Sequence, residues 1–128
     1  MDYLKLIAAV LALFATIGHF TMGNKLYLAP VLSSNIDTIP KNIMLGLFHY
    51  ASVFMVLSTI VLLGSAFKLE LWQIDFNKAE ILIAIIYGGW ALVQIIIVFT
   101  SSVKKGFAKM FQWLFWFTIA VLVFVSNI

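Results

Sequence analysis

Four long runs of apolar residues, separated by short polar segments, dominate the pattern of this chain. They cover about residues 3–22, 43–67, 79–103 and 107–125. Runs of about 18 or more apolar residues are long enough to cross the hydrocarbon core of a bilayer as helices. The third run is rich in β-branched residues, but lipid requires every backbone polar group to be bonded within the span, which favours helix. The pattern predicts an all-α, four-helix transmembrane bundle with up-down-up-down topology, forming one integral membrane domain over residues 1–128.

The connections differ in length and character. In the first, residues 23–42, Gly23-Asn24 is a helix-stop signal, and Pro30 and Pro40 argue against one continuous helix. The segment is nevertheless too apolar for a freely solvated loop, so we expect a long, partly interfacial loop between helices 1 and 2. The second connection, residues 68–78, suits an interfacial turn with Trp72 at headgroup level.

Composition supports the membrane assignment and excludes several functions. Of the 128 residues, 64% are hydrophobic and 10% are charged, against about 25% charged in a typical soluble domain. Cysteine is absent, which removes disulfides and thiolate chemistry. All eight basic residues are lysines and the net charge is only +3, so we expect no nucleic-acid partner.

The lysines also bear on orientation. Five lie with the first and third connections, and three lie with the termini and the second connection. The positive-inside tendency therefore favours a cytoplasmic first and third connection, with both termini on the non-cytoplasmic side. Lys5, close to the first span, argues the other way.

Polar residues inside the spans are the candidates for function, because each must face protein or water. His19 and His49 fall at similar depth near the lysine-rich face, roughly 5 and 9 Å from it at about 1.5 Å of rise per residue. Gln94 and Gln112 fall in the same half of the membrane. The candidate ligand-binding residues are His19, His49, Gln94, Gln112, Tyr50 and Trp113.

Two histidines on neighbouring helices allow several kinds of chemistry. They are suited to ligating a metal or holding a haem from two sides, although a metal site usually needs three or four ligands. They are equally suited to hydrogen-bonding each other, Ser52 or interfacial water. A pocket for a quinone or lipid is a further alternative. No residues form a nucleophile–histidine–acid arrangement, so we name no catalytic residue and lean against an enzyme.

One pattern in the first half of the chain resembles a known group. Gly18-His19-x3-Gly23, then Pro30, then His49-x-x-Ser52 is similar to a pattern in small bacterial four-helix inner-membrane proteins without an assigned activity. That group has tryptophan before the second histidine, where Phe48 stands here. The resemblance implies a bacterial inner-membrane location and no particular reaction.

Together these features predict a non-enzymatic membrane protein, either an accessory subunit of a larger complex or a binder of a small hydrophobic ligand or lipid. The first alternative is a redox protein that binds haem or metal through His19 and His49. The second is a small transporter or channel that works as a homo-oligomer. The cofactor, if there is one, is not determined by the sequence.

Overall fold

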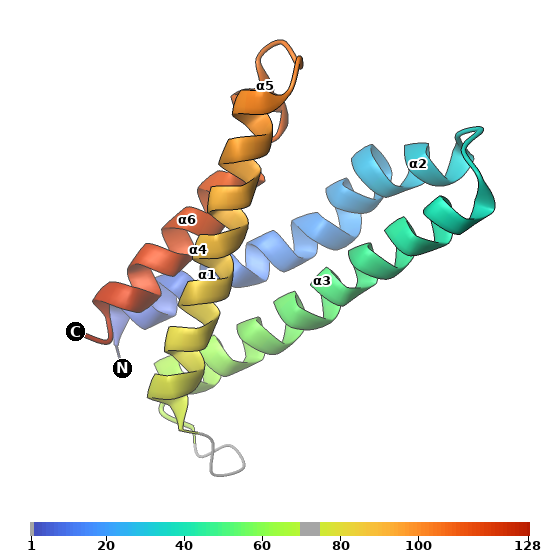
Figure 1. Cartoon of the computed structure of the whole chain (residues 1–128). Coiled ribbons are helices and arrows are strands. Elements are labelled where there is room, and N and C mark those ends of the chain that lie inside the picture. The colour runs from blue at the N-terminus through green and yellow to red at the C-terminus, as the bar shows by residue number, and fades with distance from the viewer. Residues whose placement is uncertain (1, 70–74) are drawn as a thin grey trace.

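The computed structural model describes residues 2–69 and 75–128, and every regular element in them is a helix (Figure 1). In chain order these are α1 (Tyr3–Gly18), the π-helix η1 (His19–Leu28), α2 (Ala29–Ser33), α3 (Thr38–Ala66), α4 (Phe76–Thr100), α5 (Gly106–Lys109) and α6 (Gln112–Val125). The predicted all-α class is therefore confirmed for the described residues. Trp72, expected at a headgroup turn, lies outside them.

Three continuous helical stretches in this part of the chain are long and apolar enough to cross a membrane: Tyr3–Ser33, Thr38–Ala66 and Phe76–Thr100. Their outward surfaces carry large apolar side chains such as Leu57, Ile85 and Phe99, which are mostly exposed. A surface of this kind is stable in lipid and costly in water. The chain is an integral membrane protein. The fourth apolar helix, α6, has only 14 residues.

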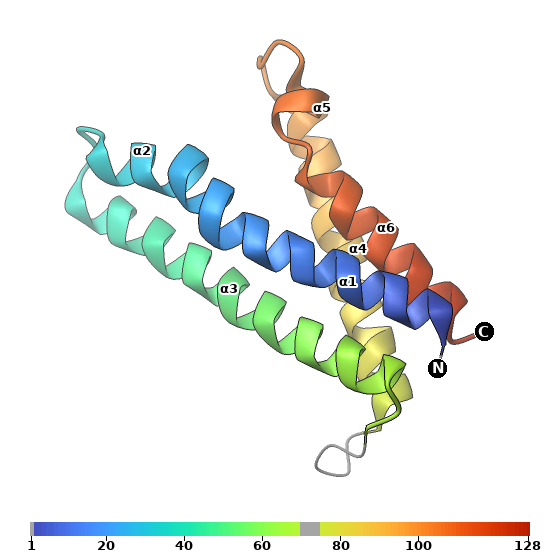
Figure 2. The same ribbon diagram turned by 180° about the vertical axis from the view of Figure 1, so that it is seen from behind.

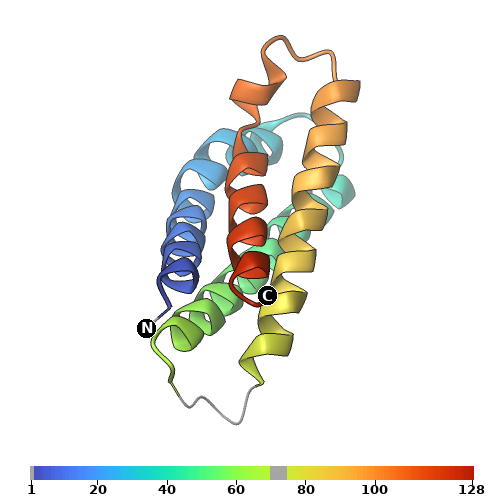
Figure 3. The ribbon, with the colours of Figure 1, turned by 90° about the vertical axis from the view of Figure 1, so that its left-hand side faces the viewer.

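The helices form two antiparallel pairs that meet at one end and separate at the other (Figures 1 and 2). One pair is α1–η1–α2 with α3, and the other is α4 with α6. Because α1 also packs along α6, the last helix lies between α1 and α4 (Figure 3). Both termini lie at the closed end, whereas α2 and α5 lie at the open end.

Small side chains allow the close approach at the closed end. Ala8, Ala9 and Ala12 of α1 are completely buried, and a Cβ at Gly88 of α4 would lie 3.8 Å from the Cβ of Ala120 in α6. Membrane helices associate largely through van der Waals packing, which small residues improve by bringing backbones together. The core of the molecule therefore lies at this end.

The prediction of a long, partly interfacial loop between helices 1 and 2 is wrong. The helix continues past Gly23-Asn24 through η1 and α2, and only residues 34–37 are non-helical before α3. Pro30 is the second residue of α2 and has no N–H to donate to the preceding turn. The preceding π-helix bonds five residues back, as Ala29 N–H does to the Asn24 carbonyl, and so ends where the proline begins.

The other boundaries shift by a few residues. The second helix begins at Thr38 rather than near residue 43, with Pro40 in its first turn. The third begins at Phe76, where the Asp75 side chain accepts a hydrogen bond from Lys78 N–H. This exposed carboxylate also pairs with the Lys78 ammonium, which lowers the pKa of Asp75. The predicted fourth span is divided, since residues 110–111 interrupt the helix between α5 and α6.

Candidate functional site

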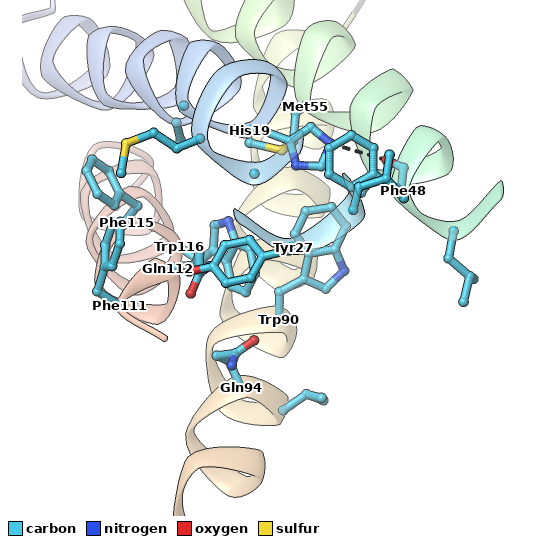
Figure 4. A pocket seen from close by; sticks show the side chains of 18 of the residues that line it. His19, Tyr27, Phe48, Met55, Trp90, Gln94, Phe111, Gln112, Phe115 and Trp116 are labelled. Atoms are coloured by element: carbon cyan, nitrogen blue, oxygen red, sulfur yellow. Dashed lines mark hydrogen bonds between the residues drawn. The ribbon is translucent and has the colours of Figure 1, made fainter. Parts of the chain in front are cut away.

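A cavity of about 960 Å³ lies between the two helix pairs, in the half of the molecule toward the open end (Figure 4). This volume lies at the upper end of the roughly 300–1,000 Å³ typical of small-molecule sites. The lining is mostly apolar and comes from four parts of the chain: α1 with η1 and α2, α3, α4, and α6 with Phe111 before it. His19, Tyr27, Gln94 and Gln112 supply its polar groups.

Aromatic rings form the cavity wall nearest the closed end. Trp90 of α4 and Trp116 of α6 both line the cavity, with ring centroids 5.5 Å apart and edge-to-face. Behind Trp90, the rings of Phe54 and Tyr87 pack at 5.0 and 5.6 Å. The Tyr87 hydroxyl lies 2.8 Å from Ser58 Oγ, so this buried polar group is satisfied. Such interlocked rings give the cavity a rigid base.

His19, at the junction of α1 and η1, is held against α3. Its ring stacks on Phe48 at 3.9 Å, and its Nε2 lies 2.8 Å from Ser52 Oγ and 3.2 Å from the Phe48 carbonyl oxygen. Ser52 donates its own proton to that carbonyl, so Nε2–H is the donor to both oxygens. The proton on Nε2 leaves Nδ1 as a hydrogen-bond acceptor on the cavity side (Figure 4).

Gln112, in the first turn of α6, carries an unused acceptor. Its Oε1 is buried and has no hydrogen-bond partner in the described part of the chain. Such an unsatisfied buried carbonyl costs about 1–3 kcal/mol. Gln94 of α4 also lines the cavity (Figure 4). The polar part of the cavity therefore has two side-chain amides, each of which can donate and accept hydrogen bonds.

One hydrogen bond crosses the cavity between the two helix pairs. Tyr27 of η1 donates its phenolic proton to the Lys109 carbonyl oxygen at the end of α5, at 3.1 Å. We call this contact the Tyr27 bridge. It lies at the lysine-rich end of the cavity, opposite the tryptophan wall, and is exposed.

The structure brings together three of the six residues expected at a ligand site, namely His19, Gln94 and Gln112. His49 and Tyr50 do not line the cavity, because Phe48 and Ser52 occupy the α3 face that meets α1, and at 100° per residue their neighbours turn outward. Trp113 also lies outside the cavity. Its ring packs edge-to-face on Phe107, and its indole N–H donates to the Phe107 carbonyl.

The two histidines of the haem or metal alternative lie in different surroundings. His19 uses Nε2 within the bundle, and the His49 side chain is exposed on α3. Across residues 2–69 and 75–128, no three His, Asp or Glu side chains lie close enough to hold a metal ion. His19 and His49 as ligands thus remain a prediction from the sequence.

Sequence reasoning missed a buried charged cluster at the closed end. Glu80, completely buried in the first turns of α4, accepts hydrogen bonds on Oε2 from Lys5 Nζ at 2.7 Å and from Asn127 Nδ2 at 2.9 Å. Its Oε1 is buried without a partner in the described residues. The available signal was that Lys5 is the one basic residue within the first apolar run. Sequence reasoning also did not identify Trp90 as a cavity residue, because a single tryptophan in an apolar run does not indicate which way it faces.

Comparisons with known proteins add no family to this geometry: no family model, curated protein or solved structure matches the chain.

Proposed function

We propose that this protein binds a small hydrophobic ligand or lipid within the membrane, in the cavity between its two helix pairs. The observation that carries the proposal is the cavity itself, about 960 Å³ with apolar walls and a few polar groups at one end. This combination of an apolar body and a small set of orienting polar groups is typical of ligand sites.

The hydrogen-bonding groups of the cavity indicate the chemical class of the ligand. His19 uses Nε2 within the bundle, which leaves Nδ1 as an acceptor, and the side-chain amides of Gln94 and Gln112 can each donate and accept hydrogen bonds. A ligand that carries hydroxyl or N–H donors at one end, and an apolar body at the other, would satisfy both parts of the cavity. No proton-transfer or nucleophilic step is needed for this role, and we assign no enzymatic activity.

We further propose that the bundle crosses a bacterial inner membrane four times, with the lysine-rich end in the cytoplasm and both termini outside. Five lysines and one aspartate belong to the end with α2 and α5, against three lysines and four acids elsewhere. Lys5, which argued against this orientation, is paired with the buried Glu80, so it contributes little free positive charge near the termini. Charge asymmetry of this kind sets the orientation of membrane proteins.

Two glycines provide a matched test of the cavity. Gly18 lines the cavity and Gly89 faces outward on α4, and a Cβ at either position would meet no atom within 4 Å. Both are helical, so replacement by leucine raises helix propensity by a similar amount, roughly 1 kcal/mol. Gly18→Leu places a side chain in the cavity beside His19, whereas Gly89→Leu adds the same side chain to the outer surface.

The measurement is native mass spectrometry of the protein purified in mild detergent, followed by extraction and identification of the bound molecule. We expect a stoichiometric adduct in the parent protein and in Gly89→Leu, and at least a tenfold lower occupancy in Gly18→Leu, since one leucine removes much of the room beside His19. Equal occupancy in the two variants, or no adduct in the parent protein, would contradict the proposed function.

A further inference from the structure

Charge is distributed unevenly along the bundle. The end with α2, α5 and their turns carries Lys25, Lys41, Lys104, Lys105 and Lys109 against Asp37 alone, a net charge of +4. The rest of the sequence has three lysines and four acidic residues, a net charge of −1. Anionic groups at the membrane surface are therefore attracted to the end at which the cavity lies.

The cavity is also open at its sides to the surrounding bilayer. Several lining residues keep a large part of their side chains exposed: 54% for Leu47 on α3, 56% for Val93 on α4 and 61% for Phe14 on α1. These positions lie on both helix pairs, which separate toward the open end (Figures 1 and 2). An acyl chain of a neighbouring lipid can therefore enter between the pairs without crossing water.

Two lysines belong to the elements that the Tyr27 bridge joins. Lys109 supplies the carbonyl of the bridge, and Lys25 precedes Tyr27 by two residues on η1; both lysine side chains are exposed. Their ammonium groups add to the positive charge of the open end, which attracts a lipid phosphate.

We propose that the cavity takes an anionic phospholipid from the lysine-rich leaflet. Its acyl chain lies between the helix pairs against Trp90 and Trp116, and its phosphate lies at the lysine-rich end, where Lys25 and Lys109 attract it. This inference rests on the proposed function and adds the class of ligand to it.

The test uses quenching of tryptophan fluorescence in nanodiscs by phospholipids with brominated acyl chains. In a Trp72→Phe/Trp113→Phe background, the remaining fluorescence comes from Trp90 and Trp116, which both line the cavity. Brominated phosphatidylglycerol and brominated phosphatidylcholine are titrated separately into unbrominated phosphatidylcholine. The quenching that Gly18→Leu removes defines the part due to the cavity.

We expect phosphatidylglycerol to produce this cavity-specific quenching at a lower mole fraction than phosphatidylcholine. The double variant Lys25→Gln/Lys109→Gln should reduce that preference by about fivefold for each lysine. The control Lys68→Gln/Lys78→Gln removes the same charge at the opposite end of the bundle and should leave the preference unchanged.

The outcomes separate this inference from the proposed function. Equal cavity-specific quenching by the two lipids, or a preference that survives Lys25→Gln/Lys109→Gln, overturns the anionic-lipid assignment and leaves the cavity as a binder of neutral ligands. Quenching that Gly18→Leu does not change for either lipid overturns the lipid assignment. If no adduct of any kind is found on the purified protein, the proposed function fails as well.

Discussion

At the residue scale, the buried pair of Lys5 and Glu80 joins three helices at the closed end. Lys5 lies in the first turn of α1, Glu80 lies in the second turn of α4, and Asn127 follows α6. The exposed fractions of the two charged side chains are 13% and 0%. The attraction between two charges shielded to this degree is strengthened by the low dielectric of their surroundings. Each charge has also lost its hydration, so removing one partner leaves the other without compensation.

Removing one member of this pair should be strongly destabilising. Glu80→Ala leaves the Lys5 ammonium buried without its carboxylate, and we expect a loss of about 3–5 kcal/mol in the free energy of unfolding. The double variant Lys5→Met/Glu80→Met removes both charges and should recover most of that loss. The measurement is chemical unfolding in detergent micelles followed by tryptophan fluorescence.

The exposed pair of Asp75 and Lys78 is the internal control. These side chains are 53% and 85% exposed, and Lys78→Ala should change stability by no more than about 1 kcal/mol. If Glu80→Ala costs no more than Lys78→Ala, the buried pair does not hold the closed end together.

At the element scale, the Tyr27 bridge is a hydrogen bond between the two helix pairs near the open end, and we expect it to limit the variation in their separation. Tyr27→Phe removes the hydroxyl that donates to Lys109 and keeps the ring. Because an exposed hydrogen bond contributes only about 0.5–1.5 kcal/mol, the fold should persist while the separation between the pairs becomes more variable. The chain has no cysteine, so spin labels can be attached through Ser33→Cys and Ser102→Cys.

Double electron–electron resonance between these labels should give a broader distance distribution in Tyr27→Phe than in the parent protein. Tyr50→Phe is the matched control, since Tyr50 is 72% exposed and lies outside the cavity. An unchanged distribution in Tyr27→Phe would show that the packing of α1 on α6 alone sets the separation.

The elements also show which features of the fold follow from the sequence. Long apolar runs locate the helices because length and hydrophobicity determine whether a segment can lie in lipid. The continuation through Gly23 and Pro30 was not predicted, because these residues usually end helices and the π-helical register that accommodates them has no sequence signature. The depth of each residue along its span predicted that His19, Gln94 and Gln112 would lie at one end of the molecule. The direction in which a side chain points around its helix axis was not predicted, because it depends on packing between helices. This direction excludes His49 and Trp113 from the cavity.

At the scale of the whole molecule, the number of crossings depends on α6. Its 14 residues extend about 21 Å at 1.5 Å per residue, less than the roughly 30 Å of a hydrocarbon core. The short α5 and the two residues after it precede α6 in the same apolar segment. A short span is accommodated by local thinning of the bilayer at modest cost, and the charge asymmetry favours a crossing that separates the lysine-rich turn from the C-terminus.

Single-cysteine labelling tests both the crossing and the orientation. Ile128, at the C-terminus, is 93% exposed, and Ser102, in the turn after α4, is exposed at the opposite end of the molecule. In intact bacterial cells, a membrane-impermeant maleimide should label Ile128→Cys at once and Ser102→Cys only after the membrane is permeabilised. Labelling of both positions on the same side would show that α6 does not cross, and the reverse pattern would place the lysine-rich end outside. The second result would also remove the attraction of that end for the anionic lipids of the cytoplasmic leaflet, because the phosphate site at Lys25 and Lys109 would then face the other leaflet.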